Sequence, residues 1–228
     1  MELDLDGTTV VLFGPGNEVD RVVLRSLASE GCSTYATRFA NSGGDLAQHS
    51  SSTRQWVAIE DEIDESAVRR VASFLGDQGL SPDAVIFHVD VIDALTARAP
   101  HRWWRSTRET KEIRQRVRNA VTEMVRASGS AALHVILLHG LASDDERTVA
   151  HRWLQRTMAS LIRSSSDSVR VNALLLSSES ASPAAGAVVA LLSSPLGTTI
   201  SGAIIPIDGG GLARDQAFAL DYEEAFDD

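Results

Sequence analysis

The sequence predicts a doubly wound, parallel α/β fold, and three observations carry this prediction. Short apolar segments rich in β-branched residues recur along the chain, and segments with helical spacing of apolar residues separate them. The strand-like segments are nearly continuous apolar runs, as expected for a parallel sheet covered by helices on both faces. The 228 residues, of which 43% are hydrophobic, are enough for one well-buried domain and short for two. We therefore expect a single domain over residues 1–228.

The expected elements alternate from the first strand to the last. Strands are predicted at TTVVLF (8–13), STYAT (33–37), QWVAI (55–59), DAVIFHV (83–89), ALHVILL (132–138), VRVNALLL (169–176) and GAIIPI (202–207). Helices are predicted over residues 19–30, 65–79, 105–128, 147–164 and 184–194. The polar residues 41–54 are expected to form a loop, and residues 213–228 an acidic C-terminal tail that ends in ALDYEEAFDD (219–228).

Composition and charge limit the cellular location that we expect and the kinds of partner that the chain would bind. The single cysteine, Cys32, excludes an internal disulfide, and the start MELDLDG has neither the basic region nor the apolar run of a secretion signal. No apolar run approaches the roughly 20 residues that cross a bilayer. A net charge of −10 disfavours nucleic acid or an anionic membrane as the main partner. We expect a cytoplasmic protein whose partner is another protein or a small molecule.

The order of the elements and four phrases of the sequence resemble the short-chain dehydrogenase/reductase family, and the resemblance extends over nearly the whole chain. TTVVLFGPG resembles the family's first strand and glycine turn, and EDEIDESAVRRV its third-strand exit and next helix. VRVNALLL resembles the sixth strand, and VVALLSSPLGTTISGAIIPIDGGG the final helix, loop and strand. The resemblance implies a Rossmann-like sheet and assembly into a dimer or tetramer.

The glycine turn departs from the family's pattern where the cofactor would bind. Such a turn uses glycines so that the backbone can approach the pyrophosphate, which rests on a helix N-terminus. Gly14 and Gly16 are present, but Glu18 and Asp20 align with the later glycines. A carboxylate about 4 Å from a phosphate charge costs about 4 kcal/mol at an effective dielectric constant near 20. We expect these four residues to form a vestigial turn that binds no dinucleotide.

Other positions near the implied cofactor site have also changed. The family's cofactor selector after the second strand falls near Thr37 and Arg38, and its Asn-Ala-Gly turn aligns with HVD (88–90). Arg38 could hold a 2′-phosphate, although an arginine that ends a strand is more often solvated. The family's long substrate lid corresponds to the short segment SSESASPA (177–184). Little remains to cover a substrate pocket.

The family's catalytic dyad is missing. Its proton donor is a tyrosine four residues before a lysine that lowers the phenol's pKa. The chain has two tyrosines, Tyr35 and Tyr222, and phenylalanine stands four residues after each. The aligned pair is Thr148 and Arg152, and arginine is no conservative replacement for lysine.

The remaining catalytic positions of the family are also substituted. The serine after the fifth strand aligns with His139 or Gly140, and the asparagine of the fourth helix falls near Glu109. We expect no catalytic residue in this chain, with Thr148, Arg152 and His139 as vestigial positions.

Three further patterns have ordinary structural interpretations. His139, His151, Asp144 and Asp145 could suggest an acid/base or metal site, but their spacing matches no ligand motif. The basic segment 99–126 contains two tryptophans, yet its interspersed glutamates favour a solvated or subunit-facing helix over a nucleic-acid site. The stripe Val149, Trp153, Leu154, Met158, Leu161 and Ile162 lies at helical spacing. We expect part of this stripe to pack on the sheet and an outward part, with Trp153, to join a subunit interface.

The leading hypothesis is a catalytically inactive subunit that assembles with and supports an active NAD(P)-dependent dehydrogenase of the same family, as a hetero-tetramer or other oligomer. NAD(P) is then expected in the active partner and not in this chain. The inactive subunit of the hydroxyacyl-CoA-type dehydrogenase in benzylsuccinate degradation is a similar arrangement, which suggests a hydroxyacyl-CoA or 3-oxoacyl substrate for the complex. The alternatives are a divergent oxidoreductase that uses Arg152, His151 or His139, and a regulatory module that senses a nucleotide or metabolite.

Overall fold

The computed structural model describes residues 3–38, 55–58, 65–89, 103–129, 132–140, 147–177 and 183–207. Its strands are β1 (Thr9–Gly14), β2 (Ser33–Arg38), β3 (Gln55–Ala58), β4 (Ala84–His88), β5 (Leu133–Gly140), β6 (Val169–Leu176) and β7 (Ile204–Ile207). Its helices are α1 (Glu18–Ser29), α2 (Glu65–Asp77), α4 (Trp103–Ser128), α5 (Arg147–Ser164) and α6 (Pro183–Ser193), with a 3-10 helix η2 (Pro195–Thr199). The predicted segments are confirmed to within a few residues at each end.

The sheet has seven parallel strands in the order β3-β2-β1-β4-β5-β6-β7. The order reverses at β1, because the chain first adds β2 and β3 on one side and then returns to add β4 on the other. In such sheets, ligands bind beyond the carboxyl ends of the strands at this reversal. The predicted doubly wound Rossmann-like fold is confirmed, and the reversal lies between β1 and β4.

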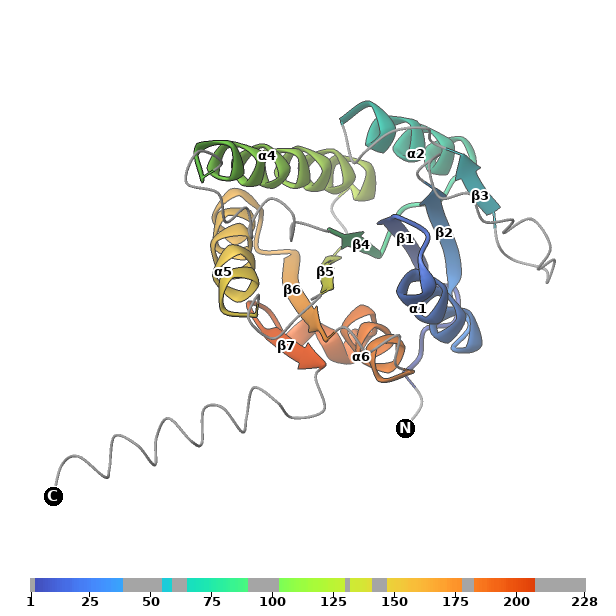
Figure 1. Cartoon of the computed structure of the whole chain (residues 1–228). Coiled ribbons are helices and arrows are strands. Elements are labelled where there is room, and N and C mark those ends of the chain that lie inside the picture. The colour runs from blue at the N-terminus through green and yellow to red at the C-terminus, as the bar shows by residue number, and fades with distance from the viewer. Residues whose placement is uncertain are drawn as a thin grey trace, which may run out of the picture.

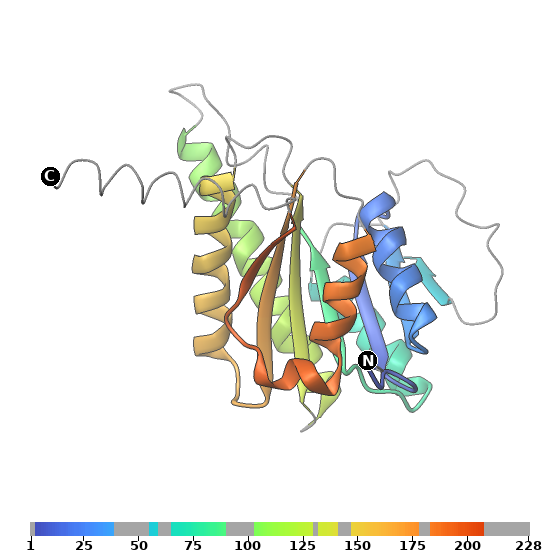
Figure 2. The same cartoon turned by 90° about the horizontal axis from the view of Figure 1, so that it is seen from below.

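Helices cover both faces of the sheet (Figure 1). Helices α2, α4 and α5 cover one face, where a core cluster includes Val68, Val117 and Leu154. Helices α1 and α6 cover the other, with Val23 and Val189 in a second cluster. Figure 2 shows the layers from a direction turned by 90°. Strands β1 and β4, which both layers cover, are buried at every residue, as their apolar sequences predicted.

Two differences from the predicted elements matter for the site. Strand β5 runs two residues beyond the predicted end, and Gly140 pairs with Leu176 of β6. His139 therefore lies in the strand and is fully buried. The segment that aligns with the family's catalytic serine is consequently part of the sheet and not a loop past it.

Trp153 does not belong to the outward part of the α5 stripe, so its expected interface role is wrong for this structure. The side chain is 3% exposed and lies in the core between α5, α4 and the sheet. Its Nε1 donates a hydrogen bond to the backbone oxygen of Thr110 in α4 at 3.3 Å. Only Val149 and Ile162 of the stripe are exposed, at 39% and 44%.

Several expectations concern residues outside the described ranges. They include the polar loop 41–54, the acidic tail 213–228, the shortened connection at 178–182, and Asp90, Asp144, Asp145 and Tyr222. Within the described residues, no helix combines the length and the apolar character needed to cross a membrane.

Candidate functional site

The turn between β1 and α1 lies at the strand-order reversal, where a cofactor diphosphate would be expected. Gly16 adopts a φ of 73°, which a residue with a side chain rarely adopts, so the turn needs glycine at this position. Asn17 caps α1, and its side-chain oxygen accepts a hydrogen bond from the backbone N–H of Asp20 at 3.2 Å. The turn is therefore well built for a strand-to-helix connection, with or without a ligand.

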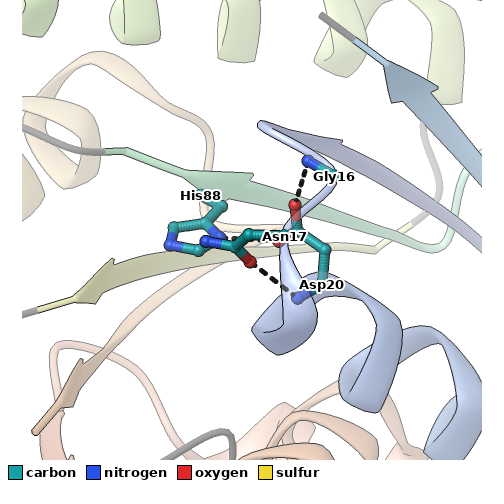
Figure 3. A network of polar contacts seen from close by, with 4 residues as sticks. All are labelled: Gly16, Asn17, Asp20 and His88. Atoms are coloured by element: carbon teal, nitrogen blue, oxygen red, sulfur yellow. Dashed lines mark hydrogen bonds and ion pairs between the residues drawn. The ribbon is translucent and has the colours of Figure 1, made fainter. Parts of the chain in front are cut away.

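The Asp20 carboxylate occupies the inside of this turn (Figure 3). Asp20 is fully buried. One carboxylate oxygen accepts a hydrogen bond from the backbone N–H of Gly16 at 2.7 Å. A side chain at the third position of a helix can reach back to the residues before it, as it does in a capping box. Asp20 thus binds, from within the chain, an amide of the turn that would otherwise be free for an anionic ligand.

His88 contacts the other oxygen of the same carboxylate. Its Nδ1 lies 2.6 Å from Oδ1 of Asp20, and the two side chains are 4% and 1% exposed. An ionised carboxylate only accepts hydrogen bonds, so the Nδ1 atom carries the shared proton when Asp20 is ionised. His88 ends β4, next to the end of β1, where Phe13 pairs with Phe87 in the sheet. The histidine therefore closes the cluster from the neighbouring strand.

Gly14 is required by Asp20 itself. A Cβ atom at Gly14 would lie 2.5 Å from a carboxylate oxygen of Asp20, a distance that real Cβ atoms do not tolerate. In a dinucleotide-binding turn, glycine allows the backbone to approach the pyrophosphate. Here the same glycine makes room for an internal carboxylate, so its presence carries no information about a bound nucleotide.

Glu18 behaves differently from Asp20, although both were expected to oppose a diphosphate. Its side chain is 55% exposed and lies 3.3 Å from Arg21 in the same helix. The sequence pattern does not distinguish the two carboxylates, but in the structure only the Asp20 carboxylate lies in the turn. The residues present do not fit a diphosphate placed against the Gly16 amide, because a buried carboxylate already holds that position.

The two aligned catalytic positions lie on the outside of α5. Thr148 and Arg152 are both exposed. His139 is buried under the same helix, with its ring edge-to-face to Trp153 at a centroid distance of 6.3 Å. The structure therefore separates His139 from the surface that carries Thr148 and Arg152. His151 is half-buried, and the described residues hold no cluster of potential metal ligands.

The described tyrosine takes part in core packing. Tyr35 of β2 is half-buried and packs edge-to-face against Phe74 of α2, with 6.1 Å between ring centroids. It follows that the phenol of Tyr35 takes part in packing on β2, whereas the position that aligns with the family's tyrosine, Thr148, lies on α5. Thr37 and Arg38 end β2, and Glu109 lies in the first turns of α4; the structure does not describe their side chains.

Sequence reasoning missed the partnership between Asp20 and His88. The two residues are 68 positions apart, and His88 was identified only as part of the altered HVD turn. The available signal was a histidine at the end of an apolar strand, at a position where the resembled family has an uncharged residue. Asn172 was also missed: its side chain donates to Ile200 and accepts from Ala203, which ties β6 to the segment before β7.

Solved structures of short-chain dehydrogenases/reductases resemble this chain. A glucose/ribitol dehydrogenase of this family from Brucella melitensis has a TM-score of 0.70 and 14% identity, over 92% of this chain and 98% of that chain. One from Serratia marcescens has a TM-score of 0.68 and 18% identity, with 90% and 98% covered. RhlG from Pseudomonas aeruginosa, solved as an NADP active-site complex, has a TM-score of 0.65 and 16% identity, with 92% and 98% covered.

The chain therefore has the short-chain dehydrogenase/reductase fold over most of its length. A scan against protein-family models gives no match, and neither does a search of curated protein sequences. At identities of 14% to 18%, the likeness defines the fold. What the chain does must then be argued from its own residues.

Proposed function

We propose that this chain is a non-catalytic subunit of the short-chain dehydrogenase/reductase fold that assembles with and supports an active NAD(P)-dependent dehydrogenase subunit. The observation that carries the proposal is the buried Asp20 carboxylate, which binds the Gly16 amide at 2.7 Å and contacts His88 at 2.6 Å. These contacts support the proposal because a side chain of the protein already binds the turn amide that a cofactor diphosphate would need.

The catalytic helix supports the same proposal. Thr148 has no phenol to donate a proton, and Arg152 carries a guanidinium group where the family's lysine tunes its tyrosine. Both are exposed on α5, and His139 is buried beneath the helix. The sheet and its helix layers are nevertheless intact. A chain that keeps its scaffold but not its chemistry is suited to a role in assembly.

The substrate of the complex follows only from the resemblance. A hydroxyacyl-CoA or 3-oxoacyl compound, as in the benzylsuccinate-pathway dehydrogenase, is the substrate class we propose for the active partner. NAD(P) would bind in that partner. This chain would contribute surface and stability to the assembly and no reacting group.

Cofactor binding tests the non-catalytic part of the proposal. Isothermal titration calorimetry with NAD⁺ and NADP⁺ should give no measurable binding to the wild-type chain. The exposed Glu18→Gly variant is the matched control and should behave as the wild type. Asp20→Gly combined with Glu18→Gly should allow weak binding without turnover, provided that circular dichroism shows a folded chain. A micromolar dissociation constant for the wild type would overturn the proposal and favour a nucleotide sensor.

Assembly is tested in the native organism. Affinity purification of the tagged chain, followed by mass spectrometry, should recover an intact short-chain dehydrogenase/reductase at a fixed stoichiometry. Reconstituting that partner with this chain should raise its activity or its thermal stability. Recovery of the chain alone, together with turnover of a carbonyl or alcohol substrate by the purified chain, would instead support the divergent oxidoreductase.

A further inference from the structure

Two hydrogen-bond donors from different parts of the chain surround the Asp20 carboxylate, and we call them the carboxylate cradle (Figure 3). The Gly16 N–H donates to Oδ2 of Asp20 at 2.7 Å, and Nδ1 of His88 lies 2.6 Å from Oδ1. Each oxygen of the carboxylate therefore has a donor of its own. This arrangement is complementary to a planar group with two oxygens.

The sheet holds the histidine of the cradle in place. Phe13 of β1 pairs with Phe87 of β4, and their rings stack with 5.1 Å between centroids. His88 pairs with Leu138 of β5, and the backbone N–H of Val89 donates to the Leu138 oxygen at 2.9 Å. The imidazole thus extends from a strand that is fixed on both sides. Donors that are fixed before a ligand arrives bind it without a further cost of ordering.

The space in the cradle matches one carboxyl group. The side chains of Asp20 and His88 are 1% and 4% exposed. A Cβ atom at Gly14 would lie 2.5 Å from a carboxylate oxygen of Asp20 and 2.9 Å from its Cγ atom. The backbone at Gly14 therefore encloses the carboxylate closely. A tetrahedral phosphate is larger and has more oxygens than these two donors can serve, so the cradle fits a carboxylate better.

The charge of the cradle also favours a single negative charge. Within the part of the chain that the structure describes, His88 is the only basic side chain that forms an ion pair with Asp20. One imidazole balances at most one negative charge, and the N-terminus of α1 adds about half an elementary charge. A diphosphate carries more negative charge than these groups compensate, and an uncompensated buried charge is costly.

The helix N-terminus alone does not account for this site. Glu18 lies in the same first turn of α1, yet its side chain is 55% exposed and contacts only Arg21, at 3.3 Å. The two carboxylates thus share the dipole of the helix but not the two donors. Enclosure of a carboxylate is a property of the Gly16 amide and His88 together.

We propose that the Gly16 N–H and His88 Nδ1 form a carboxylate-binding site whose resident ligand is the chain's own Asp20. A free monocarboxylate of the size of formate binds this site when the Asp20 carboxyl group is absent, and His88 sets the preference for carboxylate over phosphate. The inference goes beyond the proposed function, because it assigns a ligand class to the turn and involves no partner subunit.

Chemical rescue of an Asp20→Ala variant tests the site, because this variant lacks the carboxyl group and keeps both donors. The probe is sodium formate at about 100 mM, compared with sodium chloride at equal ionic strength, and melting is followed by circular dichroism. Formate should raise the melting temperature by about 3–6 °C, the shift for a tenfold change in the folding equilibrium of a domain of this size. The wild type and Glu18→Ala, whose cradles are filled, measure the general salt effect and should shift by less than about 1 °C.

Two comparisons test the selectivity. Inorganic phosphate at equal ionic strength should stabilise Asp20→Ala less than half as much as formate does. In the Asp20→Ala background, His88→Leu removes the donor and should abolish the formate effect. His88→Asn keeps an N–H donor near the position of Nδ1 and should retain most of the effect. Equal formate shifts in the Leu and Asn variants, or a shift with phosphate as large as that with formate, would overturn the inference.

Hydrogen exchange of the Gly16 amide, measured by NMR, decides the question if Asp20→Ala does not fold. In the wild type, this amide should exchange slowly, since it donates to a buried carboxylate. His88→Leu in the otherwise wild-type chain should speed its exchange about tenfold or more relative to the Val23 amide of the same helix, whereas His88→Asn should stay within about threefold of the wild type. Fast exchange in the wild type, or no difference between the Leu and Asn variants, would overturn the inference.

The outcomes are separate from those that test the proposed function. None of these measurements needs a dinucleotide or a partner. Absence of a formate effect in a folded Asp20→Ala variant would overturn the carboxylate site and leave the proposed assembly role standing. Binding of NAD⁺ by the wild type would overturn the proposed function and leave the formate result to be judged by itself.

Discussion

Replacement of Asp20 by alanine should destabilise the folded chain, because it removes the acceptor at the centre of the β1–α1 turn. The buried Gly16 N–H loses a 2.7 Å hydrogen bond to a charged oxygen, and Nδ1 of His88 loses its 2.6 Å contact. A hydrogen bond to a charged group contributes about 1.5–3 kcal/mol, and removal of one partner of a buried charge pair costs about 3–5 kcal/mol.

These contributions are not additive, since one carboxylate makes both contacts. We therefore expect a loss of about 3 kcal/mol in the free energy of unfolding. For a domain of this size, that loss corresponds to a fall of roughly 6–12 °C in melting temperature. Asp20→Asn should cost less, because its amide oxygen can still accept from Gly16 and its NH₂ group can donate to a His88 ring that carries its proton on Nε2.

Urea denaturation followed by circular dichroism measures the effect, with Glu18→Ala as the control. Glu18 is exposed and paired only with Arg21, so its replacement should cost about 1 kcal/mol or less. Equal losses for Asp20→Ala and Glu18→Ala would refute the reasoning, because the buried cluster would then contribute nothing that a surface ion pair does not.

Two further predictions concern the core. Trp153→Ala should cost about 3–5 kcal/mol in the isolated chain, measured by urea denaturation, since it empties a buried site; a loss below about 1 kcal/mol would contradict its place in the core. Burial, and next the charge of Arg170, lower the pKa of His134, whereas the charge of Asp83 raises it. The contribution of His134 to the free energy of unfolding should therefore be complete above about pH 6.5 and decrease as the pH falls below that value. In urea titrations at several pH values, the His134→Leu variant should lack this pH-dependent decrease. An unchanged pH profile in the variant would contradict the prediction.

The sequence by itself determined the succession of strands and helices. The apolar runs VVLF of β1 and AVIF of β4 lie in strands that are buried at every residue. A continuous apolar run of this kind is sufficient to predict a strand of a parallel sheet. It also determined that neither tyrosine precedes a lysine by four residues, which is a property of the chain and needs no structure. Both conclusions depend only on the spacing of residues along the chain, which is visible in the sequence itself.

Only the tertiary structure distinguished residues that look alike in the sequence. Glu18 and Asp20 are both carboxylates in the first turn of α1, but the third helical position reaches back toward Gly16 while the first points to solvent. His88 meets Asp20 because β1 and β4 pair in parallel, which brings together residues 68 positions apart.

The same distinction explains Trp153 and Arg114. Helical spacing placed Trp153 on an apolar stripe, but which neighbour that stripe meets depends on α4, whose Thr110 carbonyl accepts the indole hydrogen bond. Arg114 is one of many charges on a basic helix in the sequence, but in the fold burial, and then the charge of Arg156 of α5, lower its pKa. Burial and charge coupling between helices depend on how the helices pack. Spacing within one helix defines its faces, and only the packed fold decides what each face contacts.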